Sequence, residues 1–193
     1  MSRFCYLGNM IDAGGGAEAA VTARIRSGWK KFRELAPFLT FRAPPPKVKG
    51  KVYAACIRKC MTYGSETWSL KSDSAQRLER TEMRMVRWMC GTSLREKQRG
   101  EDLLQSMGLT KITDEIRQSR LRWYGHVVRR EESHWLKKAW RFEVVGPRPR
   151  GRPRKTWDET LAEDLRLSNL ANVDVRNRTE WNRAIKERQR PTP

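Results

Sequence analysis

"SDSAQRLERTEMRMVRWMC", residues 72–90, carries the clearest helical pattern in this chain. At about 100° per residue, Leu78, Met85 and Met89 gather on one side of such a helix. The polar residues at positions 72–74 offer N-caps at its start. An apolar stripe of this kind is buried against other elements of a folded domain. The stretch therefore predicts an amphipathic helix in a mainly α-helical protein.

A row of four arginines occupies a different side of the same helix, at Arg77, Arg80, Arg84 and Arg87. The four positions fall within an arc of roughly 80° and follow one another about one turn apart. Guanidinium groups spaced in this way suit the repeated phosphates of a nucleic-acid backbone. A solvated face that Glu79 and Glu82 neutralise in part gives the same pattern, so both interpretations stay open.

The charge of the whole chain favours the first interpretation. The 193 residues include 41 Lys and Arg against 22 Asp and Glu, which gives a formal net charge of +19. The basic excess occurs in every quarter of the sequence, so it belongs to the body of the protein. A field of this sign attracts phosphate backbones and, less often, anionic membrane surfaces. We expect RNA, DNA or their hybrid as the partner, and no membrane.

No apolar run has the length of a membrane span, and the first ten residues hold no apolar segment typical of a signal peptide. We therefore expect an intracellular protein, in the nucleus rather than the cytoplasm. The four cysteines are expected to be reduced thiols. Cys56 and Cys60 stand four apart, as two zinc ligands on a helix would, but zinc-finger spacings are absent. Since they share an apolar stripe with Val48 and Val52, buried thiols are favoured and no metal site is expected.

Helical patterns extend on both sides of the opening stretch. A short strand-like run and a glycine turn occupy the first sixteen residues, and "FEVV" (142–145) predicts a brief strand. The prolines in 42–47 separate two helices, and Thr156 with Glu159 forms a capping box for a later one. The expected helices are 18–39, 47–63, 72–90, a segment that follows a cap at Thr113 and reaches Arg130, a short segment at 135–140, one after Thr156, and 174–186. The predicted fold is thus mainly α, with two small bundles joined by a basic Arg/Pro-rich linker and little strand.

The helix after Thr113 places aromatic residues beside arginines. Its apolar face contains Ile116, Leu121, Trp123, Tyr124, Val127 and Val128, and Arg122 and Arg129 lie on the opposite face. The aromatic side chains could form a platform on which bases stack. A core helix with a basic outer face is favoured, because the aromatic and aliphatic side chains share one face. Arg120 falls inside the apolar arc and is expected to extend outward to solvent.

The joining segment "GPRPRGRPRKTW" (146–157) has its own basic residues, at Arg148, Arg150, Arg152, Arg154 and Lys155. Residues that precede proline favour extended conformations, so the segment predicts a narrow ribbon. An extended "RGRP" ribbon resembles the core of AT-hook motifs, whose arginines enter the minor groove of A·T-rich DNA. A basic linker between domains would have the same sequence pattern, and both interpretations stay open.

Catalysis finds little support in the sequence. No serine, histidine and acid grouping has recognisable local context, and no glycine-rich phosphate loop follows a strand. The adjacent carboxylate pairs mostly stand near expected helix starts, where the helix dipole favours negative charge. We therefore expect no active site and no cofactor.

Five stretches of the chain resemble one known family, in order and over almost the whole length. They are "FCYLGN" (4–9), "KVKGKVYAACIRKCMTYGSETWSL" (47–70), "RLERTEMRMVRWMCGTSLR" (77–95), "RLRWYGHVVRR" (120–130) and "RGRPRKTW" (150–157). These stretches look like the C-terminal part of a non-LTR retrotransposon reverse transcriptase, closest to the RTE type. The resemblance implies proteins that nick genomic DNA, bind their own RNA and copy it at the nick.

The resemblance also implies a division of the chain. Tyr6–Gly8 would end the catalytic palm, and Ala17–Thr40 would be a thumb helix that holds the primer and template. The expected segments are a palm-end remnant (1–16), thumb-like helices (17–72), a basic helical region (73–145), the AT-hook-like linker (146–155) and a C-terminal helical pair (156–193). The palm domain of a full-length reverse transcriptase is then a second candidate partner.

The palm aspartates of the family, in a Tyr-x-Asp-Asp turn that holds two Mg²⁺ ions, have no counterpart in this sequence. The expected chain is therefore a non-catalytic, nucleic-acid-binding fragment of an RNA-directed DNA polymerase. Met1 is then either an internal start in a truncated copy or the start of a gene model cut from a degraded element. Three alternatives remain. They are part of an active polymerase supplied in full elsewhere, a host DNA-binding protein with an AT-hook-like motif, and a non-functional remnant.

Overall fold

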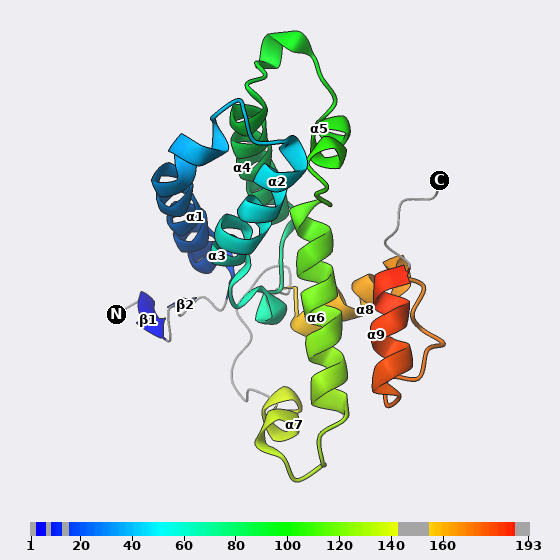
Figure 1. The fold of residues 1–193 in the computed structure, drawn as a ribbon. Coiled ribbons are helices and arrows are strands. Elements are labelled where there is room, and N and C mark those ends of the chain that lie inside the picture. The colour runs from blue at the N-terminus through cyan, green and yellow to red at the C-terminus, as the bar shows by residue number, and fades with distance from the viewer. Residues whose placement is uncertain (1–2, 7–8, 13–15, 143–154, 188–193) are drawn as a thin grey trace. The chain divides into compact units, whose positions relative to one another are not determined.

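A computed structural model of the protein describes residues 3–6, 9–12, 16–142 and 155–187 (Figure 1). This part of the chain is mainly α-helical, as the sequence predicts. Strand β1 (Arg3–Tyr6) pairs antiparallel with strand β2 (Asn9–Asp12), and Phe4 stands opposite Ile11. The sequence predicts one strand-like run here, so the second strand is new. None of the helices in the described ranges is both long and apolar enough to cross a lipid bilayer.

The chain folds into two compact units, residues 1–116 and 117–193, each with its own core. Their boundary falls inside helix α6 (Ile112–Val128). The first unit also contains α1 (Glu18–Leu39), α2 (Pro46–Val52), a π-helical turn (Tyr53–Arg58), α3 (Lys59–Thr62), α4 (Ser72–Cys90), α5 (Gly100–Ser106) and 3-10 turns at Ser65–Thr67 and Leu94–Glu96. The second unit contains α7 (Trp135–Trp140), α8 (Trp157–Leu167) and α9 (Arg178–Glu187).

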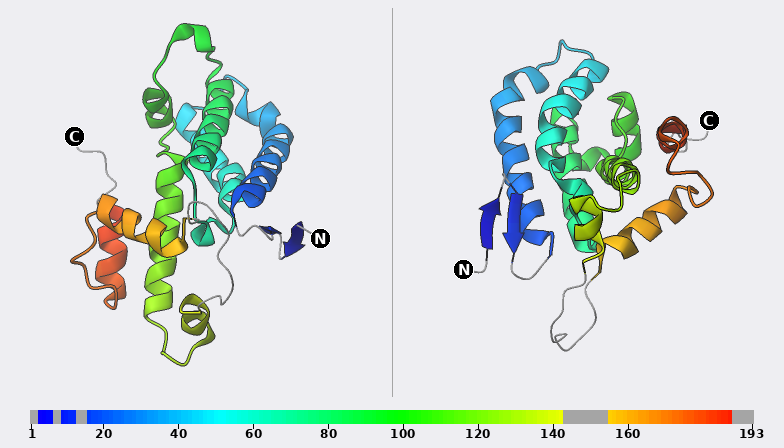
Figure 2. Two further views of the ribbon diagram at one scale, coloured as in Figure 1. Left: turned by 180° about the vertical axis from the view of Figure 1, so that it is seen from behind. Right: turned by 90° about the horizontal axis from the view of Figure 1, so that it is seen from below.

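Within the first unit, α1 and the run from α2 to α3 lie side by side, as Figures 1 and 2 show. The prolines at positions 44–46 separate the two, as predicted. Pro46 takes the first position of α2, where its missing N–H is not needed. The sequence did not predict α5 or the turn at Leu94–Glu96.

A π-helical turn changes which face of the second predicted helix is buried. The turn widens the helix, so the 3.6-residue repeat does not carry across it. Tyr53, Ile57 and Met61 are fully buried, whereas Val48 is 42% exposed. The predicted stripe that joined Val48 to Cys56 is therefore wrong at its N-terminal end. Cys56 is half-buried rather than enclosed in the core.

A buried carboxylate, Glu82 of α4, organises the first unit. Its Oε1 accepts hydrogen bonds from Nε and Nη2 of Arg58, at 2.9 and 2.6 Å. Its Oε2 accepts the backbone N–H of Ile112 at 3.0 Å, so Glu82 caps the start of α6. Burial raises the pKa of Glu82 above its ordinary value, although Arg58 favours the charged form. The predicted cap, Thr113, instead donates its hydroxyl to Glu79 Oε1 at 2.7 Å.

The second unit is built around Trp181 of α9, which is fully buried. Its indole Nε1 donates to the carbonyl of Leu121 in α6 at 3.0 Å. Gly125 makes this approach possible, because a Cβ there would stand 2.6 Å from the same Nε1. The buried core residues around it are Leu121, Leu161, Leu170 and Ile185. Helices α8 and α9 therefore share a core with the second half of α6.

The position of the Arg120 side chain differs from the sequence prediction. Its side chain does not extend to solvent: the residue is 2% exposed and its Nη1 donates to Asp164 Oδ2 at 2.5 Å. Asp164 is itself buried on α8 and lies 3.5 Å from Nε of Arg117. Arg120 is buried inside the apolar arc of α6 because the carboxylate of Asp164, from a distant helix, compensates its charge.

The start of α8 agrees with the sequence and the start of α9 does not. The N–H of Glu159 donates to Thr156 Oγ1, and the N–H of Thr156 to Glu159 Oε2, both at 3.1 Å, which confirms the capping box. Helix α9 begins at Arg178 rather than at Asp174, because Asn177 Oδ1 accepts the N–H of Glu180 at 3.2 Å and caps the helix. The strand predicted at 142–145 lies, from residue 143 on, outside the described residues.

Candidate nucleic-acid interface

The arginine row of α4 lies on the exposed side of that helix. Arg77, Arg80 and Arg84 are exposed and Arg87 is half-buried. Leu78, Met85 and Met89, on the other side, are buried in the core of the first unit. The helix thus separates the arginines from its apolar stripe as the sequence predicts.

All four arginines contact neutral groups. Arg77 Nη2 donates to Thr22 Oγ1 at 3.0 Å, Arg80 Nη2 to Gln76 Oε1 at 2.8 Å, and Arg87 Nη2 to the carbonyl of Gln98 at 3.1 Å. The Arg84 guanidinium lies 5.6 Å from the ring centroid of Trp29. In the part of the chain that the structure describes, no carboxylate forms an ion pair with any of the four.

The two acids expected to neutralise the arginine row point elsewhere. Glu82 is buried against Arg58, and Glu79 accepts a hydrogen bond from Thr113. Among the described residues, neither of these two acids forms an ion pair with the row. Both interpretations of the row, a phosphate-binding face and a solvated face, stay open.

A groove runs along the C-terminal half of the row. It has a volume of about 600 Å³ and is lined by Arg80, Met83, Arg84, Arg87, Trp88, Thr92 and Leu94. We call it the α4 groove. Arginine and apolar side chains share its walls.

In the second unit, the two predicted arginines of α6 differ in their contacts. Arg122 is exposed and its Nη2 donates to Gln118 Oε1 at 2.8 Å. Arg129 is half-buried and its Nη1 donates to the carbonyl of Val175 at 2.8 Å, which holds the segment before α9 against α6. Arg122 is therefore available for a phosphate, whereas Arg129 also has a structural task.

The aromatic residues of α6 divide between the core and the surface. Tyr124 packs edge-on against Trp140 and Trp181, as a core residue. Trp123 is half-buried and stacks on His126, with ring centroids 5.4 Å apart and planes inclined by 19°. The core interpretation holds for Tyr124, and Trp123 stays at the surface.

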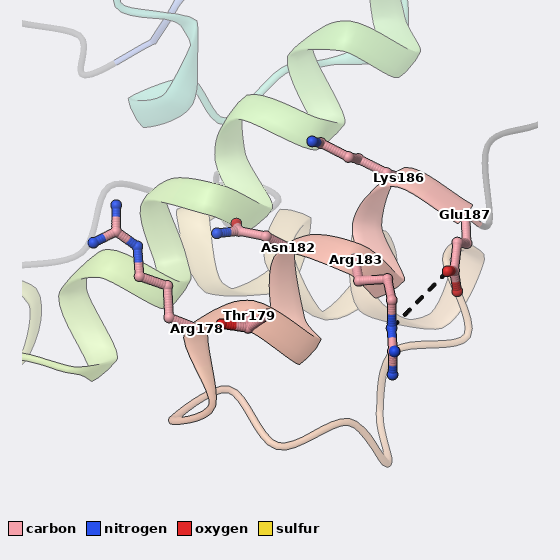
Figure 3. Close-up of a pocket in the computed structure, with 6 residues that line it drawn as sticks. All are labelled: Arg178, Thr179, Asn182, Arg183, Lys186 and Glu187. Carbon is pink, nitrogen blue, oxygen red and sulfur yellow. Dashed lines mark ion pairs between the residues drawn. The ribbon is translucent and has the colours of Figure 1, made fainter.

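Helix α9 has basic residues that the sequence pattern did not single out. Figure 3 shows Arg178, Asn182 and Lys186 on one side of the helix, in the lining of a shallow pocket. Arg183, from another side, forms an ion pair with Glu187 at 3.9 Å. The signal in the sequence was the spacing of four residues between successive members of the first set.

The linker residues give less information. Lys155 is half-buried and its Nζ lies 2.6 Å from Glu163 Oε2, so its charge is paired. The other predicted linker residues lie outside the described residues: Arg148, Arg150, Arg152 and Arg154. Their predicted role in nucleic-acid binding stays a prediction.

In the described ranges, no three His, Cys, Asp or Glu side chains gather into a candidate metal site. Cys56, Cys60 and Cys90 are half-buried free thiols. Burial raises the pKa of the Cys90 thiol above its ordinary value, which disfavours the thiolate that a metal requires.

The chain is similar to a transposon-derived protein. The chain is 24% identical to an uncharacterized transposon-derived protein of Caenorhabditis elegans, over 98% of this chain and 68% of that protein. No family model matches the chain, and no solved structure matches it. The similarity over nearly the whole chain points to a protein related to transposons.

Proposed function

We propose that this chain is the nucleic-acid-binding part of a retrotransposon reverse transcriptase, and that it grips the template–primer or the target DNA through phosphate contacts. The observation that carries the proposal is the arginine row of α4. Among the described residues, its exposed guanidinium groups contact neutral partners and form no ion pair with Glu79 or Glu82. A row of cations one helical turn apart fits consecutive phosphates.

Two further observations support the assignment to a retroelement. The chain resembles the region that follows the palm in RTE-type reverse transcriptases, over most of its length. Its relative in Caenorhabditis elegans is transposon-derived. The net charge of +19 agrees with a polyanionic partner.

The proposed role is binding without catalysis. The Tyr-x-Asp-Asp turn that polymerases of the family use to hold Mg²⁺ does not occur in the sequence. A palm domain supplied by a full-length reverse transcriptase would provide the chemistry, and this chain would hold the nucleic acid near it.

The test is binding of the purified protein to an A·T-rich duplex, a G·C-rich duplex and a structured RNA across a salt series. We expect tight binding that weakens steeply with salt. Replacing Arg77, Arg80 and Arg84 by glutamine should weaken binding to all three ligands. If each arginine contacts one phosphate, the slope of log K against log salt falls by about 2–3 for duplex DNA.

A matched control removes three exposed cations from α2 and α8: Lys47→Gln, Lys51→Gln and Arg166→Gln. This variant has the same net charge as the triple variant of the arginine row. We expect it to keep most of the wild-type affinity. Equal losses in the two variants would show that overall charge, and not this helix, binds nucleic acid.

The AT-hook-like segment "PRGRPRK" (149–155) favours one second candidate, a host DNA-binding protein. This candidate predicts a strong preference for the A·T-rich duplex, because arginines enter its narrow minor groove. The preference would be lost on Arg152→Ala. Equal binding to the two duplexes excludes it.

A further inference from the structure

The α4 groove holds large apolar side chains that the arginine row does not explain. Trp88 is 53% exposed and Leu94 is 79% exposed. Each places apolar surface in water, which is unfavourable by about 25 cal/mol per Å². Phosphate contacts alone require neither side chain.

Trp88 is fixed in place by aromatic residues of α1. Its ring centroid lies 5.4 Å from that of Phe32 and 6.4 Å from that of Trp29. Phe32 is fully buried, so the cluster rests on the core of the first unit. The indole is therefore held on a rigid support while half of its surface stays open. A ligand that stacks on it does not have to order it first.

The end of α4 brings Leu94 into the same groove. Gly91 adopts a left-handed conformation (φ 66°), and the N–H of Thr92 donates to the carbonyl of Arg87 at 3.0 Å. Ser93 and Glu96 then form a capping box for the turn Leu94–Glu96. This local structure turns the chain back and makes Leu94 part of the groove lining.

The charged members of the groove are all arginines. Arg80 and Arg84 are exposed and Arg87 is half-buried. A purely apolar partner would bury these guanidinium groups without acceptors, which is unfavourable. The ligand that fits has flat apolar faces joined by an anionic backbone. Nucleobases and phosphates have this chemistry.

We propose that the α4 groove binds an unpaired stretch of RNA or DNA, with a base stacked on Trp88 and adjacent phosphates on Arg80 and Arg84. This inference rests on the proposed function and deepens it. Bases inside a duplex are stacked on each other, so Trp88 acts only on a single strand, whereas the arginines also bind a duplex.

The first experiment compares oligo(dT) and oligo(U) with a duplex of the same length, for wild type, Trp88→Leu and Trp88→Phe. Trp88→Leu should weaken binding of both single strands by about 10-fold and leave duplex binding and the salt slope unchanged. Trp88→Phe should retain most of the affinity, because phenylalanine still stacks. Trp135→Leu removes a 67% exposed tryptophan of α7 and serves as the matched control, with no expected loss.

The second experiment uses the wild-type protein and does not depend on how the variants fold. An oligonucleotide that carries 5-iodouracil is photo-crosslinked, and the modified peptide is identified by mass spectrometry. We expect the crosslink at Trp88. Crosslinks confined to other tryptophans, or equal effects of Trp88→Leu on single strands and duplex, would overturn the proposal.

The two proposals fail in different ways. In one case the wild type binds duplex and single strand, and loss of the arginine row weakens both. If Trp88→Leu then changes neither affinity, only the stacking inference is wrong. If the wild type binds no nucleic acid, the proposed function is wrong as well.

Discussion

His126 shows how a single residue of the second unit depends on its cationic surroundings. Its Nε2 accepts hydrogen bonds from Arg130, at 3.1 Å from Nη2 and 3.4 Å from Nε, which requires a neutral imidazole. Burial lowers the pKa of His126 below 6.5, and Arg130, Arg129, Arg178 and His134 lower it further. Protonation would add a positive charge to a cluster that has no nearby acid among these neighbours.

This environment predicts a pH dependence of stability. Since the folded protein holds a lower pKa than the unfolded chain, the unfolded state takes up the proton first as the pH falls. The stability that neutral His126 contributes is fully present above about pH 6.5. It is lost as the pH falls through the pKa of folded His126. The melting temperature of the wild type should drop more between pH 7.5 and 5.5 than that of His126→Gln, which keeps an acceptor for Arg130. An equal drop in both proteins, or an NMR titration midpoint of His126 above 6.5, contradicts this.

At the scale of elements, boundaries in this protein are set by single backbone features. The π-helical turn at Tyr53–Arg58 rotates the buried face of the run from Pro46 to Thr62. Gly91 ends α4 with a positive φ, and no atom stands within 4 Å of where its Cβ would be. A substitution at Gly91 therefore acts through the backbone and not through a clash.

Gly91→Ala is expected to destabilise the protein by about 1–2 kcal/mol, because an L-residue is strained in the left-handed region. Gly91→Asn should lose less, since asparagine tolerates this conformation. Denaturant unfolding monitored by circular dichroism measures both. If the alanine variant is as stable as the asparagine variant, the left-handed conformation of residue 91 does not strain the variants. Single-strand binding should weaken with Gly91→Ala as well, because Leu94 follows from this turn.

At the scale of the whole molecule, two units with separate cores share one continuous helix, α6. The first unit is organised by the buried pair Arg58 and Glu82, and the second by Arg120 and Asp164. Both pairs join helices that are distant in the sequence. Removing one partner of a buried pair leaves an uncompensated charge, which destabilises by about 3–5 kcal/mol.

Asp164→Asn should therefore destabilise the second unit by about this amount. Hydrogen exchange followed by mass spectrometry should show faster exchange in α8 and α9 and unchanged protection in α1 and α4. The double variant Arg120→Met with Asp164→Leu replaces the pair by apolar groups and should recover most of the protection. Uniformly faster exchange throughout the described helices would show that the two units unfold as one.

The sequence by itself determined the helices with strong periodicity or clear caps, and the separation of the arginine row from the apolar stripe of α4. These features depend on residues within one or two turns of each other, so local patterns contain them. The capping box at Thr156 and the proline break before α2 are of the same kind. The basic character of the surface also followed directly from composition.

Only the tertiary structure decided whether a charged residue on a partly apolar helix is buried or exposed. Their charge assigned Glu82 and Arg120 to the surface in the sequence analysis, yet both are buried because their partners, Arg58 and Asp164, come from distant segments. The cap of α6 was missed for the same reason, since Glu82 supplies it from α4. The α4 groove depends on Trp29 and Phe32 of α1 and on the turn at Leu94, so no single stretch of sequence displays it. Compensation of charge and support of an exposed ring are pairwise effects across the fold, and one-dimensional periodicity does not contain them.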